Sequence, residues 1–453
     1  MIQAAPRAVK RPRKQTPRDV LAHLFMAGWI CVLLQGALRK WVFPGLTILY
    51  LIQDLPLMLA YVYAFWKGLV WGGKLGWTCI GISILLGIET LLQLIFGDLH
   101  MRTAVVGLHH YIFYLPILFL APVAYNFRHR LQFIRWNLIV IIPMALIAAL
   151  QSRAPRGAWI NRTTAGDEGG FGLVGDTVRA TGTFNFTLTY SLWCGIAVGL
   201  VLGEWLLPPR RRSFKSKPLL LICTLSAVMA TMVSGSRSAV MLGALGFLGA
   251  FGAVVFTRHV KNILRFAAVI VGMPIVTVIS YFAAPASFTA VVDRFSSTGV
   301  EEQLTTRIEH MFFGFTYVPP YSILGAGIGY GIPAANPGAG ANVGVVLSEH
   351  EPIRIVQEMG SYVGTGLVIF RYAAGIGLML FSFKCLTLPR GHSMPHAVPL
   401  AFAVAPILMV GELLRSAPML ATQVFYVMAL VLGAYLFREE PLESNPVQLS
   451  ETR

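Results

Sequence analysis

The chain has 453 residues, of which 56% are hydrophobic and only 12% are charged. Soluble domains carry about 25% charged residues, so this composition excludes an ordinary soluble protein and indicates an integral membrane protein. The formal net charge of +16 is compatible with nucleic-acid binding. The distribution of that charge argues against nucleic acid as a partner, because basic residues gather at alternate ends of long apolar runs.

Twelve apolar runs predict membrane-spanning helices, although several are shorter than the ~17–25 residues that usually cross the hydrocarbon core. In chain order they occupy residues 20–37, 46–66, 75–96, 104–125, 137–151, 187–207, 218–233, 239–256, 265–284, 361–385, 397–413 and 419–437. We therefore expect an all-α polytopic membrane protein with about twelve transmembrane helices.

The basic residues orient these helices, because positively charged loops remain in the cytoplasm. They place both termini inside, so the expected order is a basic tail (1–19), helices one to five (20–151), an outer loop (152–186), helices six to nine (187–284), a large outer loop (285–360), helices ten to twelve (361–437) and a second tail (438–453). The first apolar run lacks a small-residue cleavage site and is expected to remain as an uncleaved helix.

Basic residues on the outer side are all arginines except Lys40. Arginine binds phosphate through a planar, permanently charged fork, so this set fits the binding of an anion. A generally arginine-rich proteome is the alternative explanation. The five cysteines all lie in predicted spans, and the sequence contains no metal-binding motif, so no metal or cofactor is expected.

The large outer loop has three parts. Residues 285–316 include apolar positions at helical spacing and predict a helix lying against the outer membrane surface. A glycine-rich hinge follows at 323–344; it lacks the features of a nucleotide-binding loop, so we expect its glycines to provide backbone freedom. Residues 348–366 predict a helix that leads into the tenth span.

Several polar residues stand out against this apolar background. Arg237 is the only charged residue between positions 218 and 257, and it lies between serines at the outer ends of two spans. An arginine at the centre of a bilayer costs ~2.5–3.5 kcal/mol on insertion scales, so a wet outer cavity is its expected place. The serine-flanked arginine is a candidate phosphate cradle, with a simple turn as the alternative.

Two further groups lie in the outer segments. Arg307 and His310 are three residues apart in the predicted surface helix, while His350, Arg354 and Glu358 repeat every four residues and would share one helix face. A solvated charged face is the default reading of such a pattern, although Arg371 and Glu412 in neighbouring spans are placed to approach the same cavity. The intramembrane acids Asp54 and Glu89 would serve a proton relay in a transporter or pair with arginines.

Four motifs, in this order, resemble the O-antigen ligase and polymerase superfamily. They are "RATGTF" at 179–184, "SGSRSA" at 234–239, "TRIEHMFFGF" at 306–315 followed by "ILGAGIGYG", and "EHEPIRIVQEMGSYVG" at 349–364. The resemblance covers roughly residues 175–385. It implies a bacterial inner-membrane glycosyltransferase with a donor glycan on undecaprenyl pyrophosphate and a second glycan as acceptor, acting without a metal.

The resemblance also implies roles for individual residues. Arg179, Arg237 and Arg307, with Arg354, become candidate ligands of the pyrophosphate, where preorganised cations stabilise the leaving group. The candidate catalytic residues, which would orient or deprotonate the acceptor hydroxyl, are His350, Glu349 and Glu358. Aligning the family motif on Glu358 puts Glu349 where a ligase carries its histidine, with His350 one place later.

That departure favours a polymerase of lipid-linked repeat units over a ligase that joins finished glycans to the lipid A core. A chain-length regulator and the flippase of the same pathway are candidate partners, together with the lipid bilayer. A transporter of lipid-linked sugars is the alternative from another class. Transporters often contain repeated halves, which this sequence lacks, and the large asymmetric outer loop also argues against one.

Overall fold

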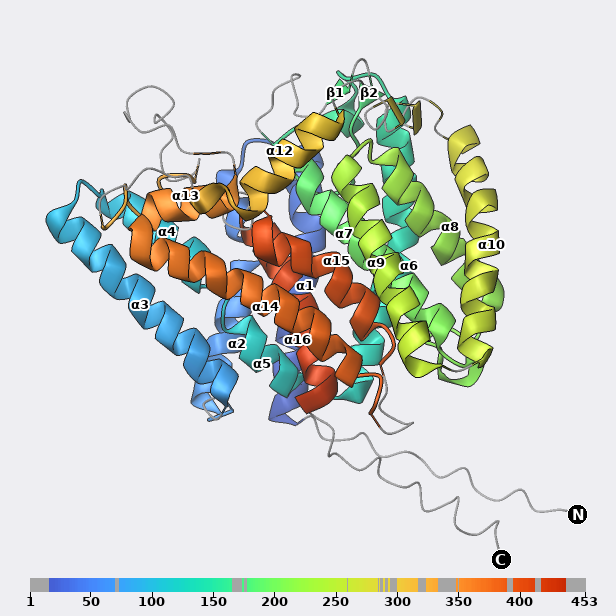
Figure 1. Ribbon diagram of the computed structural model, residues 1–453, viewed down its shortest axis with the longest axis horizontal. Helices are drawn as coiled ribbons and strands as arrows, with labels where there is room; N and C mark the ends of the chain where they lie inside the picture. Colours follow the sequence, from blue (N-terminus) through green and yellow to red (C-terminus); the bar gives the residue numbers. More distant parts are fainter. Residues whose placement is uncertain are drawn as a thin grey trace, which may run out of the picture.

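The computed structural model describes residues 16–69, 73–164, 173–174, 177–258, 260–283, 285, 288–289, 292–293, 300–316, 323–332, 348, 350–388, 394–411 and 417–436. Nearly all of these residues are helical, as expected for an all-α protein (Figure 1). A two-residue antiparallel hairpin, β1 (Leu173–Val174) and β2 (Thr177–Val178), lies in the predicted outer loop 152–186. Most of the predicted tails and of the hinge at 323–344 lies outside the described residues.

In chain order, the helical elements comprise helices at the predicted apolar runs and shorter helical segments between them. They are α1 (Pro17–Ala37), η1 (Leu38–Val42), η2 (Thr47–Leu51), α2 (Asp54–Trp66), α3 (Lys74–Phe96), α4 (Met101–Ile112), α5 (Ile117–Ala124), α6 (Phe127–Arg153), η3 (Trp159–Asn161), α7 (Thr187–Leu206), η4 (Pro209–Arg211), α8 (Lys217–Val233), α9 (Arg237–Thr257), α10 (Val260–Ala283), α12 (Val300–Phe312), η5 (Gly314–Thr316), α13 (Glu351–Met359), η6 (Gly360–Gly364), α14 (Thr365–Lys384), α15 (Ala397–Val410) and α16 (Ala417–Leu436).

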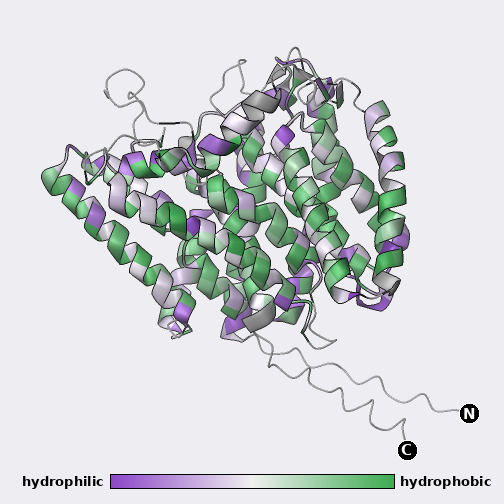
Figure 2. Ribbon diagram, in the orientation of Figure 1, coloured by the Kyte–Doolittle hydropathy of each residue, from purple (hydrophilic) through white to green (hydrophobic). Residues whose placement is uncertain are grey.

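Nine helical stretches in the described part of the chain are long and apolar enough to cross a membrane. Three of the predicted runs instead coincide with shorter apolar helices, at Lys217–Val233, Ala397–Val410 and Pro418–Ala434. Large apolar side chains are exposed on the outer helices, among them Phe96 on α3 and Val271 on α10. Figure 2 shows hydrophobic residues along most of the helices, and together with the exposed apolar side chains this supports a multi-pass membrane protein.

Two boundaries differ from the sequence-based expectation for a physical reason. Helix α6 begins at Phe127, ten residues before the predicted run, because the Asn126 side chain accepts a hydrogen bond from the His129 amide (3.0 Å) and caps the helix. The run 104–125 is divided into α4 and α5 next to Pro116, which has no amide proton to continue the helix.

The bundle has two distinct ends in Figure 1. Helix α1 begins and α16 ends at what we call the terminal end. The opposite end, which we call the loop end, carries the β1–β2 hairpin, α12 and α13. Helix α7 lies at the centre of the bundle and packs against α9 and α15. Gly195 and Gly199 on α7 lie against these two helices, and their small size allows the backbones to approach closely.

Candidate functional site

The "RATGTF" segment forms a buried turn at the loop end. The amides of Thr181 and Gly182 both donate to Oε1 of Gln151 on α6, at 3.0 and 2.8 Å. Gly182 has a φ of 56°, in the left-handed region that favours glycine. The Gln151 amide also donates to the Gly182 carbonyl at 3.1 Å. The Gln151 side chain therefore bonds to two amides and one carbonyl of the turn that follows Arg179, and so holds that turn in place.

Lys40 supports the same turn from η1. Its Nζ donates to Thr181 Oγ1 at 3.1 Å and to the carbonyls of Gly182 and Phe184 at 2.8 Å each. The side chain is only 2% exposed. The one lysine among the predicted outer basic residues is thus a buried donor to the backbone, and not a surface cation.

The "SGSRSA" segment forms a second fixed turn, between α8 and α9. Gly235 has a φ of 60°, and Arg237 is the first residue of α9. The Ser236 amide donates to Ser234 Oγ (3.2 Å), and the Ser191 hydroxyl on α7 donates to Ser236 Oγ (3.1 Å). These bonds tie the turn to the central helix, so the position of Arg237 is defined by packing.

The structure brings Arg179 and Arg237 together. A Cβ atom built on Gly235 would lie 3.6 Å from Cγ of Arg179, so that side chain crosses the second turn. Burial, followed by the positive charge of Arg237, lowers the pKa of the Arg179 guanidinium. Within the part of the chain that the structure describes, Nε of Arg179 is buried and has no hydrogen-bond partner. Two cations held this close form a candidate anion site.

Helices α12 and α13 lie at the same end of the bundle (Figure 1). Arg307 lies in α12, but its side chain and the whole of Glu349 are outside the described residues. His310 of α12 and His350 meet with ring centroids 5.8 Å apart in an edge-on arrangement. Both histidines are at least partly exposed.

The predicted helix face of His350, Arg354 and Glu358 is wrong for His350. That residue is the N-cap of α13, with a non-helical ψ of 122°, so the helix begins one residue later. Arg354 and Glu358 do lie in α13. Both are buried, so the solvated charged face, which is the default reading of the pattern, is also wrong.

The buried charges around α13 compensate one another. Arg354 is paired with Glu351 through Nη2 and Oε2, and its Nε lies 3.7 Å from Oε1 of Glu358. Arg371 of α14 reaches Glu351 at 3.1 Å and also donates to the carbonyls of Leu408 and Gly411. Two arginines and two glutamates thus form a neutral cluster, which permits their burial. Glu412 lies outside the described residues.

Glu358 also holds the glycine-rich segment. Its carboxylate accepts hydrogen bonds from the Tyr111 hydroxyl (2.9 Å) and from the amides of Gly331 (2.8 Å) and Gly329 (3.2 Å). Gly329 has a φ of 90°, which agrees with the predicted need for backbone freedom in residues 323–332. These contacts give Glu358 a structural task in the fold.

Gln93 of α3 holds the same segment from the other side. Its amide donates to the carbonyls of Leu324 (2.6 Å) and Glu358 (2.9 Å), and its Oε1 accepts from the Ile328 amide at 2.8 Å. The glycine segment is therefore pinned between α3, α4 and α13. Gln93, Tyr111, Gln151 and Lys40 were not predicted as site residues. For Gln93 and Gln151 the sequence does offer a signal, because each is an uncharged polar residue within a predicted apolar run.

A separate polar cluster lies between α2 and α4. Nε2 of His109 is 3.0 Å from Oδ2 of Asp54, and the Tyr114 hydroxyl donates to Oδ1 at 2.8 Å. The sequence left two alternatives for the intramembrane acids, a proton relay and pairing with arginines. In the structure Asp54 pairs with His109 and not with an arginine. Glu89 accepts a hydrogen bond from Gln93 at 3.4 Å.

The loop end thus combines an arginine pair, two adjoining histidines and a pinned glycine segment. Among the described residues, no three His, Cys, Asp or Glu side chains lie close enough together to hold a metal ion. A scan against protein-family models and a search of curated proteins find no match for this chain.

Proposed function

We propose that this protein is a glycosyltransferase that polymerises lipid-linked oligosaccharide repeat units at the periplasmic face of a bacterial inner membrane. The observation that carries the proposal is the pair formed by Arg179 and Arg237, each held on its own hydrogen-bonded turn. The positive charge of Arg237 acts on the Arg179 guanidinium, and an anion bound by both arginines would be stabilised by two positive charges. Undecaprenyl pyrophosphate supplies such an anion.

The reaction places its developing charge at this pair. An acceptor hydroxyl attacks the anomeric carbon of the donor sugar, a glycosidic bond forms, and the bond to the pyrophosphate breaks with its electron pair on the leaving oxygen. Cations held in place before the reaction stabilise that negative charge without reorganisation. Arg307 on α12 is the proposed third ligand, since α12 lies at the same end of the bundle.

The acceptor proton needs a base at the same end. His350 is the proposed base, with His310 beside it at 5.8 Å, because imidazole titrates near neutral pH and both rings are accessible. Glu349 is the alternative base next to it in sequence. Glu358 accepts a hydrogen bond from the Gly331 amide and Arg354 is ion-paired with Glu351, so we propose that they position the glycine segment and α13.

A second candidate function rests on another observation. The Asp54–His109 pair is partly buried between α2 and α4, and ionisable pairs within membrane-spanning bundles serve proton relays in transporters. A ligase that transfers finished glycans to lipid A core would use the same arginine pair and differ only in its acceptor. The flippase and a chain-length regulator of the pathway are the proposed partners.

Lipid analysis of a strain lacking the gene tests the proposal. A polymerase predicts single lipid-linked repeat units on the outer face; full-length unattached chains would identify a ligase, and units trapped inside would identify a flippase. Complementation with Arg237→Ala and Arg237→Lys should restore protein in the membrane without restoring polymer. Arg102→Lys, an exposed arginine of α4, is the matched control and should restore polymer fully. Polymer in both Arg237 variants would contradict the arginine pair.

A further inference from the structure

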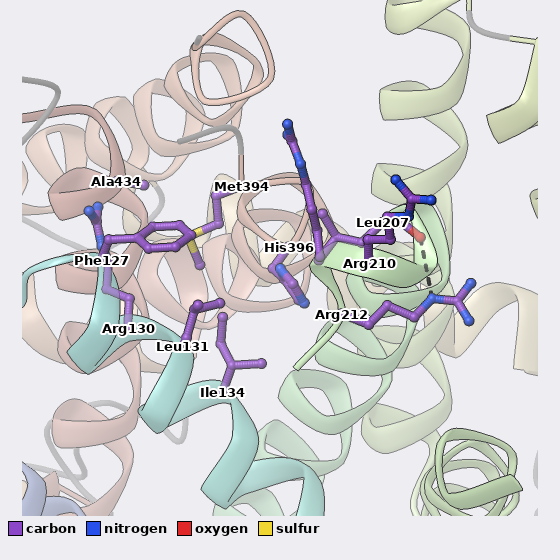
Figure 3. A pocket seen from close by; sticks show the side chains of 11 residues that line it. Phe127, Arg130, Leu131, Ile134, Leu207, Arg210, Arg212, Met394, His396 and Ala434 are labelled. Carbon is purple, nitrogen blue, oxygen red and sulfur yellow. Dashed lines mark hydrogen bonds between the residues drawn. The ribbon is translucent and has the colours of Figure 1, made fainter. Parts of the chain in front are cut away.

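The terminal end of the bundle contains a cavity of about 300 Å³ (Figure 3). Its walls come from the start of α6, the connection between α7 and α8, the residues just before α15, and the end of α16. Four arginines and a histidine line it: Arg130, Arg210, Arg211, Arg212 and His396. The other six lining residues are all apolar, so the described lining contains no acidic side chain.

Among the described residues, the acid that contacts the lining residue His396 is already engaged by its neighbours. Glu204 of α7 lies behind His396, with Oε1 3.2 Å from Nε2 of the imidazole, and it accepts a hydrogen bond from the Ser213 amide at 2.9 Å. Burial, then the charge of Arg265, lowers the pKa of the Arg212 guanidinium, and Glu204 opposes this only as the smallest effect. The field inside the cavity is therefore positive.

One of these arginines, Arg130, differs from an ordinary cytoplasmic charge in where it lies. Basic residues at the inner ends of spans are usually solvated, and exposed Arg210 and Arg211 fit that pattern. Arg130 does not, because it is only 4% exposed and projects from the first turn of α6 towards the cavity. Figure 3 shows Arg130 on the α6 side of the cavity and Arg210 and Arg212 on the opposite side, where Arg212 Nε donates to the Leu207 carbonyl at 3.3 Å.

The apolar part of the lining identifies the class of ligand. A free inorganic anion gains nothing from contact with side chains such as Ile134 and Met394, whereas an amphiphile uses both the cationic and the apolar surface. Basic pockets between transmembrane helices at the cytoplasmic surface are suited to anionic lipid headgroups. A volume of about 300 Å³ is at the lower end of ligand sites and fits a headgroup rather than a whole lipid.

We propose that this cavity binds the phosphate headgroup of an anionic phospholipid, with the first part of an acyl chain against the apolar lining. Arg130 from α6 and Arg210 to Arg212 from the α7–α8 connection provide the positive charge that attracts the phosphate, and guanidinium groups donate hydrogen bonds to its oxygens. The lipid links α6, the α7–α8 connection and the start of α15, and so stabilises the terminal end. The site lies at the opposite end from the Arg179–Arg237 pair and is independent of the proposed reaction.

Thermal unfolding of the purified full-length protein tests the proposal. The delipidated protein, in neutral detergent, receives dioleoyl-phosphatidylglycerol, dioleoyl-phosphatidylcholine or inorganic phosphate over the same concentration range, and lipid retained after washing is measured by mass spectrometry. Phosphatidylglycerol should raise Tm saturably and be retained, while phosphatidylcholine and phosphate should do neither. An equal shift with phosphatidylcholine, or an equal saturable shift with phosphate alone, would overturn the lipid-headgroup site.

Two double variants locate the effect. Arg210→Gln with Arg211→Gln removes two exposed charges from the cavity and should weaken phosphatidylglycerol binding about thirtyfold, since each arginine near an anionic lipid contributes roughly fivefold in affinity. Lys215→Gln with Lys217→Gln removes the same charge from the same connection without touching the lining, and it should leave binding unchanged. Equal weakening by both variants would mean general surface attraction and would refute the cavity.

Discussion

Replacement of Lys40 by methionine tests whether a buried lysine positions the candidate site. Methionine keeps the apolar length of the side chain but removes the ammonium and its three hydrogen bonds to Thr181, Gly182 and Phe184, at 3.1, 2.8 and 2.8 Å. The Gly182 carbonyl keeps its bond from Gln151, whereas the Phe184 carbonyl loses the lysine as a donor. We expect the turn to loosen and Arg179 to lose its fixed position.

The size of the effect follows from the bonds that are lost. Each hydrogen bond to a charged group contributes about 1.5–3 kcal/mol. The loss of the three hydrogen bonds is partly offset, by several kcal/mol, because the variant no longer has to bury an ammonium group. The net decrease in the free energy of unfolding is then about 2–4 kcal/mol, and Tm should fall by several degrees.

Three measurements characterise the Lys40→Met variant. They are thermal unfolding in detergent, hydrogen exchange of the Thr181 and Gly182 amides, and the amount of polymer formed in a complemented deletion strain. Tm should fall, both amides should exchange faster, and polymer should be lost although the protein still inserts. Lys74→Met makes the same chemical change at an exposed lysine and should behave as wild type. Wild-type stability, exchange and polymer in Lys40→Met would refute the role of this lysine.

Two further substitutions test the packing of the loop end. Glu358→Gln keeps the shape of a fully buried carboxylate but removes its charge, so the free energy of unfolding should fall by about 3–5 kcal/mol and Tm should decrease. The Gly331 amide, which donates to Glu358 at 2.8 Å, should exchange faster. Unchanged exchange would show that the charge does not hold the segment. Gly36→Ala would put a Cβ atom 2.0 Å from the Thr183 carbonyl oxygen, so the yield of monodisperse protein in size-exclusion chromatography should drop sharply; Gly366→Ala, in open space, is the control, and equal yields would contradict the packing.

Hydropathy predicted the helices well because a long apolar run has few alternatives to a helix inside a bilayer. Boundaries were less predictable where a single side chain decides them. Asn126 extends α6 over ten mostly polar and aromatic residues by capping its first turn, which no hydropathy window detects. Pro116 separates α4 from α5 within one apolar run.

The candidate site was predictable in part. Arg179 and Arg237 were both selected from the sequence, and the structure brings them together, because each flanks a glycine-containing turn at the same end of the bundle. No sequence pattern indicated that Glu358 is buried against two glycine amides. The glycines that bond to Glu358 lie outside α13 in the chain. Gln93 likewise bonds to residues that are distant in the sequence, Ile328 and Leu324. Only tertiary packing brings such partners together.

Reconstitution of the purified chain tests the central claim most directly. Proteoliposomes are supplied with undecaprenyl-pyrophosphate-linked repeat units in the presence of a metal chelator, and chain length and released undecaprenyl pyrophosphate are measured together. A polymerase that uses the arginine pair should release one undecaprenyl pyrophosphate for each new glycosidic bond. Neither product should form with Arg179→Lys or Arg237→Lys. Correctly folded wild-type protein that moves the lipid-linked unit across the bilayer without extending it would contradict the account.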